Sequence, residues 1–198
     1  MAIVSEQAHP SLARDRSDLA RLIQAIVGRD QAALADLYEL TVNRVYSLAM
    51  TMARNANDAE EIVGDVYLQI WQRAAQYDPE RGSVLAWLLV QCRSLALDLL
   101  RRRRPQRAIA TLLAQQEGGE EAKDESWTAE ELLSFYQEGS AVHRALASLN
   151  EMQRRLIGLA FFQGLSHQEI ADAVQLPVGT VKSHIRRGLQ HLRKTIEL

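Results

Sequence analysis

The residue types that usually carry enzyme chemistry are present, but their spacing does not favour catalysis. The second half of the chain holds four histidines: His143, His167, His184 and His191. None of them belongs to a nucleophile–base–acid pattern, and Cys92 lies on an apolar helical stripe, where a small core residue is expected. No glycine-rich phosphate loop follows a strand pattern, and no Cys/His cluster has metal-ligand spacing. We predict a protein that is not an enzyme and holds no metal or cofactor.

The positions of the basic residues indicate a different chemistry, the binding of phosphates and base edges. Residues 98–107 hold five arginines against one aspartate, and residues 177–198 hold five lysines and arginines against Glu197. Arginine and lysine contact phosphates and read guanine edges. Residues 105–140 carry eight acids and two bases, so the formal net charge of −2 conceals two basic patches. We therefore expect binding to nucleic acid.

The C-terminal basic residues follow a pattern typical of a helix-turn-helix. Ser166 and Glu169 fit a capping box, which predicts a helix from about His167, and Pro177 suits the first turn of the next helix. The expected buried stripe of that second helix is Val181, Ile185, Leu189 and Leu192. Its other face presents hydroxyls and cations suited to a major groove: Thr180, Lys182, Ser183, Arg186 and Arg187. The alternative is a helical hairpin whose arginines face water.

Helical spacing of apolar residues also dominates the first half of the chain. Stripes over 17–27 and 31–53 predict two helices, and Asn57 or Asp58 is expected to cap a third. Composition predicts a loop over 78–83, after which Ser83 caps a long helix. That helix is expected to end in an arginine run before Pro105, where cations suit the helix dipole.

These patterns predict an all-α fold of two small helical domains, over 17–104 and 141–198, joined by a flexible acidic linker over 105–140. A short amphipathic piece is expected around 127–136. The sequence shows neither a signal peptide nor an apolar run long enough to span a bilayer, so we expect a cytoplasmic protein.

A family resemblance is carried by residues 58–104, which read DAEEIVGDVYLQIWQRAAQYDPERGSVLAWLLVQCRSLALDLLRRRR. An acidic-aliphatic helix ending in tryptophan, a short loop, a Trp-Leu helix and arginines follow in that order. This run resembles the core-binding and promoter-melting segment of extracytoplasmic-function (ECF) sigma factors of the sigma-70 family. The segment LYELTVNRVYSLA, residues 37–49, is similar to the family's first helix. The resemblance implies a region 2-like bundle and a region 4-like helix-turn-helix in a factor that directs RNA polymerase to promoters and aids their opening.

The resemblance implies that the first domain docks on a coiled coil of the polymerase β′ subunit. On this sequence the docking face would be the outer side of the third helix: Glu61, Asp65, Leu68 and Gln72. Acids beside an aliphatic residue suit a basic, amphipathic partner helix. Without the family, the same residues fit a solvated helix face with one stray leucine.

The resemblance also assigns recognition of the promoter −10 element to the loop over 76–83 and the helix after it. Candidates there are Trp87, Gln91 and Ser94, with phosphate contacts from Arg101, Arg102, Arg103 and Arg104. A loop pocket can hold a flipped base, and aromatic rings stack on unpaired bases. Trp87 fits a core position equally well, and the arginines fit a plain helix end.

Two positions depart from the family pattern. Ser94 stands where the family often has asparagine, so a family consensus promoter does not transfer to this chain. Gly64 stands where glutamine or a similar residue is common. Glycine costs about 1 kcal/mol in a helix interior, so Gly64 either permits close packing or is merely tolerated.

The family's remaining partners follow from the second domain and the linker. The helix-turn-helix is expected to read the −35 element and to meet the polymerase β flap, and an anti-sigma factor is expected to clamp both domains. The acidic linker either threads the RNA path of the polymerase or is an ordinary tether. Two other classes compete: a ligand-sensing DNA-binding regulator, whose receiver domain would need alternating strands and helices, and a helical adaptor, which leaves both basic patches unexplained.

Overall fold

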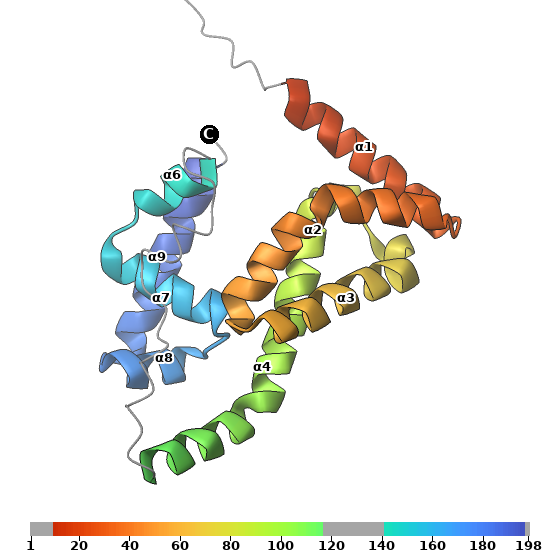
Figure 1. Ribbon diagram of the computed structural model, residues 1–198. Helices are drawn as coiled ribbons and strands as arrows, with labels where there is room; N and C mark the ends of the chain where they lie inside the picture. The colour runs from red at the N-terminus through yellow and green to blue at the C-terminus, as the bar shows by residue number, and fades with distance from the viewer. Residues whose placement is uncertain (1–9, 117–140, 197–198) are drawn as a thin grey trace, which may run out of the picture. The chain divides into compact units, whose positions relative to one another are not determined.

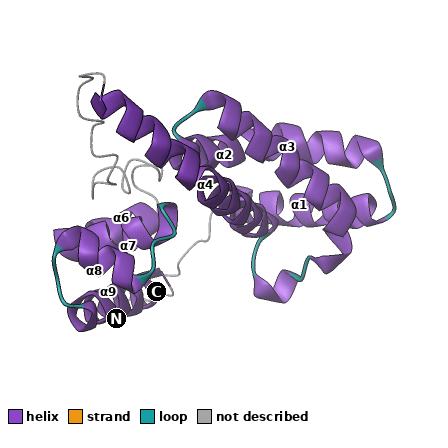
Figure 2. Cartoon of the chain, turned by 90° about the horizontal axis from the view of Figure 1, so that it is seen from below, coloured by secondary structure: helices purple, strands orange, loops and turns teal. Residues whose placement is uncertain are grey.

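The computed structural model describes residues 10–116 and 141–196, with side chains at 17–103 and 141–196. Every regular element in these ranges is a helix, which confirms the all-α prediction (Figure 2). The chain divides into two compact units, residues 1–96 and 97–198. Within the described ranges, no helix combines the length and the apolar character needed to cross a membrane. The amphipathic piece expected around 127–136 lies outside the described residues.

The N-terminal unit is built around α2 (Gln31–Ala53), which packs against both α1 (Pro10–Val27) and α3 (Ala56–Arg73) (Figure 1). The apolar stripes of these helices meet in one core, whose fully buried side chains include Ile23, Leu37, Leu48, Ile62 and Ile70. Burial of an aliphatic side chain of this size stabilises a fold by about 1.5–3 kcal/mol.

The start of α3 differs from our prediction. Asn55, not Asn57 or Asp58, is the N-cap, and its side chain accepts the backbone N–H of Asp58 at 3.1 Å. Asp58 lies in the first helical turn and is buried. The preceding helix ends at Arg54 in a left-handed conformation (φ 53°), so the cap position falls on the very next residue.

Helix α4 spans Val84–Gln116, and our prediction that it ends before Pro105 is wrong. Proline lacks an N–H donor and crowds the preceding turn, at a cost of about 3 kcal/mol inside a helix. The residues around it are good helix formers, mostly arginine, alanine, leucine and glutamine, which favour continuation. The arginine run therefore lies inside the helix, and the dipole argument for its position no longer applies.

The C-terminal unit contains α6 (Ala141–Ala147), α7 (Glu151–Phe162), α8 (His167–Val174) and α9 (Val178–Ile196). Helix α9 packs against the other three, and the core includes Leu156, Phe162, Ile170 and Val181. Gly188 allows α7 and α9 to approach, because a Cβ at this position would lie 2.8 Å from Cδ1 of Ile157. Helices α8 and α9, which form the predicted DNA-binding motif, thus both pack against α7.

Candidate nucleic-acid and polymerase interfaces

The C-terminal motif folds as two helices joined by a short turn. Ser166 and Glu169 make both bonds of the capping box that starts α8. Gln175 ends α8 in a left-handed conformation (φ 54°). The carbonyl of Pro177 then accepts the N–H groups of Thr180 (2.8 Å) and Val181 (3.1 Å), so proline flanks α9 rather than lying inside it. These local bonds fix where the second helix begins.

The buried stripe of α9 follows our prediction for half its length. Val181 and Ile185 are buried, but Leu189 is 52% exposed and Leu192 is half-buried. The prediction for Leu189 is wrong because Gly188, one residue earlier, occupies the contact with α7. An apolar side chain is thus left on the surface of the helix.

The five candidate DNA-binding residues lie on the first three turns of α9. Lys182, Arg186 and Arg187 are exposed, whereas Thr180 and Ser183 are half-buried. The Ser183 hydroxyl donates to the Thr180 carbonyl (2.8 Å), and Arg187 donates to the Ser183 carbonyl through Nε (3.2 Å) and to its hydroxyl through a terminal nitrogen (3.3 Å). Ser183 therefore has no free proton for a phosphate, and its clearest contribution is to orient Arg187.

On α3, the predicted docking residues share one outer face. Glu61 and Gln72 are exposed, Leu68 is 53% exposed and Asp65 is half-buried. Gly64 lies on the same face, and nothing stands within 4 Å of the position of its missing Cβ. Packing within the described fold therefore does not require a glycine at position 64. Either an outside partner needs the space beside this position, or the glycine is merely tolerated.

An aromatic residue beside this face escaped the sequence analysis. Tyr38 of α2 is 40% exposed, and its ring centre lies 4.8 Å from that of Tyr67, the residue before Leu68. Tyr38 fits the apolar stripe of its own helix, so nothing in the residue pattern indicates that its ring reaches the surface. The face combines acids, a leucine and a tyrosine, which suits an amphipathic partner.

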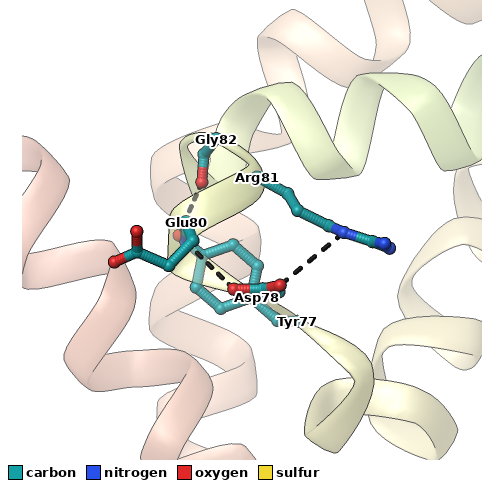
Figure 3. A network of polar contacts seen from close by, with 5 residues as sticks. All are labelled: Tyr77, Asp78, Glu80, Arg81 and Gly82. Atoms are coloured by element: carbon teal, nitrogen blue, oxygen red, sulfur yellow. Dashed lines mark hydrogen bonds and ion pairs between the residues drawn. The ribbon is translucent and has the colours of Figure 1, made fainter.

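The loop between α3 and α4 is more ordered than its composition suggested. It contains two short 3₁₀ turns, Ala74–Gln76 and Pro79–Arg81. Asp78 caps the second turn by accepting the N–H of Glu80 (3.0 Å), and the Tyr77 hydroxyl donates to the Gly82 carbonyl (3.0 Å) (Figure 3). Ser83 accepts the N–H of Ala86 (3.2 Å), which confirms the predicted cap of α4.

The candidates after this loop follow one another at steps of four and three residues on α4. Trp87 and Gln91 are half-buried and Ser94 is exposed. The Trp87 ring centre lies 5.5 Å from that of Tyr77, at an interplanar angle of 48°. Trp87 is thus neither a fully buried core residue nor an isolated surface ring.

The arginine run does not form one surface. Arg101 and Arg102 are exposed, and both interact with Asp98. Arg101 pairs with the Asp98 carboxylate (3.6 Å), and Arg102 donates to the Asp98 backbone carbonyl (3.3 Å). Arg103 is half-buried, and the side chain of Arg104 is outside the described residues. Successive helical residues point about 100° apart, so these side chains cannot all meet one line of phosphates.

Titratable groups do not gather into a metal-binding cluster in the described ranges. No group of three or more His, Cys, Asp or Glu side chains could hold a metal ion there. Cys92 is fully buried, and burial raises the pKa of its thiol to about 12, so a thiolate is strongly disfavoured near neutral pH.

Comparisons with known proteins agree with this two-part arrangement. The Sigma-70 region 2 family matches residues 37–106, and the Sigma-70, region 4 family matches residues 145–194. The ECF RNA polymerase sigma factor SigK of Mycobacterium tuberculosis is 32% identical over 184 residues, which cover 92% of this chain and 95% of SigK. This chain belongs to the ECF sigma factors of the sigma-70 family. A sigma factor is a transcription initiation factor and not an enzyme, in agreement with the sequence analysis.

Further relatives of this sigma factor show similar coverage. The ECF RNA polymerase sigma factor RpoE of Cereibacter sphaeroides is 36% identical over 181 residues, covering 91% of this chain and 96% of RpoE. Among solved structures, Rhodobacter sphaeroides SigE in complex with the anti-sigma ChrR is 32% identical, covers 88% of this chain and 98% of SigE, and gives a TM-score of 0.47.

Proposed function

We propose that this sigma factor docks on the β′ coiled coil of core polymerase through Glu61, Asp65, Leu68 and Gln72. The observation that carries the proposal is the 53% exposure of Leu68 on the same helix face as two carboxylates. An apolar side chain of this size at the surface favours a partner that covers it, and the acids favour a basic one.

The promoter contacts are divided between the two helical units. Trp87, Gln91, Ser94 and the 76–83 loop take the −10 element, with phosphate contacts from exposed arginines of the run 101–104. Helix α9 reads the −35 element through Thr180, Lys182, Arg186 and Arg187, and Ser183 acts by holding Arg187. The working domains are 17–104 and 141–198, and α4 extends into the acidic connector over 105–140.

Run-off transcription with purified core polymerase tests this function on a pool of genomic promoter fragments. We expect specific transcripts with the wild-type protein and their loss with the Asp65→Ala/Leu68→Ala double variant. The matched control is Asp36→Ala/Leu40→Ala, which removes the same residue types from α2, where Leu40 is 63% exposed. A protein that shifts duplex DNA unaided but yields no transcript would instead be a DNA-binding regulator of another class.

Control by an anti-sigma factor completes the proposal, together with a cytoplasmic location, contact with the β flap and no direct membrane insertion. A protein that covers the α3 face would block docking on polymerase by competition. A pull-down from native cells should recover such a factor as well as polymerase subunits. Recovery of polymerase subunits without any such factor would count against this part of the proposal.

A further inference from the structure

The loop over 77–83 is held in one shape by contacts that leave its tip exposed. The Tyr77 hydroxyl bonds to the Gly82 carbonyl at 3.0 Å, so a side chain joins the two ends of the loop (Figure 3). Between these ends, Asp78 caps the 3₁₀ turn, and the N–H of Gly82 donates to the Pro79 carbonyl at 3.4 Å. The turn residues themselves, Pro79–Arg81, are exposed.

The backbone conformation of this loop requires a glycine at position 82, although there is room for a larger side chain. Its φ of 141° and ψ of −179° fall in a region that is essentially restricted to glycine. A Cβ at this position would have Ala86 Cβ, at 4.0 Å, as its nearest neighbour. The conformation of Gly82 directs its carbonyl toward Tyr77. We call the resulting hydrogen bond between the Tyr77 hydroxyl and the Gly82 carbonyl the Tyr77–Gly82 clasp.

Tyr77 also connects the clasp to the helix that follows. Its ring packs beside Trp87, with centres 5.5 Å apart, while its hydroxyl makes the bond to Gly82. The loop and the aromatic side chain proposed for the −10 element are therefore positioned by the same residue. The substitution Tyr77→Phe would remove the hydrogen bond to Gly82 and keep the ring contact with Trp87.

Arg81 is the cation of the loop and is only loosely held. Its side chain is 87% exposed, and its Nε lies 3.6 Å from the carboxylate of Asp78. An exposed pair at this distance contributes little to stability, so the guanidinium remains accessible to an outside partner. Guanidinium groups bind phosphate oxygens through paired N–H donors, so this geometry suits a nucleic-acid backbone.

We propose that Tyr77 is a positioning residue for capture of the unpaired −10 strand, and that Arg81 contacts a phosphate of that strand. The inference rests on the proposed function of this sigma factor. The loop is held in shape before DNA arrives, so less conformational entropy is lost at the moment of strand capture.

The test uses holoenzyme reconstituted from core polymerase and the full chain, with a fluorescent single-stranded oligonucleotide that carries the −10 sequence of a promoter found by run-off transcription. Tyr77→Phe should weaken binding by about threefold to tenfold, the effect of one lost hydrogen bond, with an unchanged salt dependence. Arg81→Gln should reduce the slope of log affinity against log salt by about 0.7, the value for one phosphate contact on a single strand. Gly82→Ala should weaken binding at least as much as Tyr77→Phe.

Two control variants and the thermal midpoint separate this role from general damage. Tyr46→Phe and Arg44→Gln change a half-buried tyrosine and an exposed arginine of α2, and both should bind as the wild type does. Wild-type affinity in both Tyr77→Phe and Gly82→Ala would overturn the positioning role, as would a loss of affinity that merely tracks a lowered thermal midpoint. An unchanged salt slope in Arg81→Gln would overturn the phosphate contact. Either of these negative results would overturn this inference alone, because the wild-type protein would still support transcription. A wild-type protein that yields no transcript would overturn the proposed function and this inference together.

Discussion

Two ionisable residues in the N-terminal unit, Cys92 and Tyr67, are buried in their neutral forms. Desolvation raises the pKa of the Cys92 thiol from 9.0 to about 12, and its sulfur lies 3.6 Å from the Val45 carbonyl. Desolvation also raises the pKa of Tyr67 from 10.0 to about 12, and its hydroxyl is hydrogen-bonded to that of Thr41 (2.8 Å). Thr41 donates its own proton to the Leu37 carbonyl, so Tyr67 is the donor in that bond.

Alkaline pH should therefore destabilise the N-terminal unit. The unfolded chain loses the Cys92 proton from pH 9.0 upward and the folded chain only near 12, so stability falls as pH rises through this window. Urea unfolding followed at about pH 8 and about pH 10.5 should show this loss, and Cys92→Ala should reduce it. An equally steep loss in Cys92→Ala would assign the effect to other groups.

The turn between α1 and α2 is tied to the last turn of α3. Arg29 has a left-handed backbone (φ 66°), donates to the Trp71 carbonyl at 3.0 Å and places its guanidinium carbon 5.3 Å from the centre of the Trp71 ring. Trp71 lies in the last turn of α3, where carbonyls lack helical partners and cations are favoured. The arginine thus joins three helices through one side chain.

Replacement of Arg29 should separate its side-chain and backbone effects. We expect Arg29→Ala to lower the free energy of unfolding by about 1–2 kcal/mol, from the lost bond and cation–π contact. Arg29→Gly loses the same contacts but adopts positive φ without cost, so it should be less destabilising than Arg29→Ala. Chemical denaturation measures both. The reverse order would show that the backbone conformation is not strained.

Two helical glycines should respond differently to the same substitution. Gly64→Ala should raise the free energy of unfolding by about 1 kcal/mol, because a Cβ meets nothing within 4 Å. Gly188→Ala should lack this gain, because its Cβ would lie 2.8 Å from Ile157. If the stabilised Gly64→Ala protein also binds core polymerase more weakly, Gly64 serves the docking face. Unchanged binding would mean that the glycine is merely tolerated.

Charge is segregated along the chain. Two basic patches flank residues 105–140, whose eight acids bring the formal net charge to −2. Net charge governs non-specific encounter with DNA, and local patches govern specific contacts. We expect this balance to oppose the encounter of the unaided protein with DNA.

Neutralising the acidic segment should reverse this behaviour. Replacing its eight acids with Asn or Gln changes the formal net charge from −2 by +8, to +6. We expect the unaided protein to associate with duplex DNA about tenfold faster at low salt, with the difference shrinking as salt is raised. Stopped-flow anisotropy measures these rates. Equal rates for the two proteins would show that the segment does not oppose DNA encounter.

The helical class, the helix-turn-helix and the family are predictable from the residues alone, because they depend on apolar spacing, caps and residue order within short segments. The capping box at Ser166 and the cap at Ser83 were predictable for this reason. The prediction that α4 ends before Pro105 is wrong because the helix propensity of the whole segment outweighs the local effect of one proline.

Which predicted faces are exposed depends on how the helices pack against one another. Leu189 was expected in the core, but a neighbouring glycine takes the contact with α7. Tyr38 reaches the surface because Tyr67 packs beneath it, and the Tyr77–Gly82 clasp depends on a backbone conformation that composition does not specify. Helical periodicity repeats every few residues, so it predicts an apolar side but not which neighbour covers each position along it.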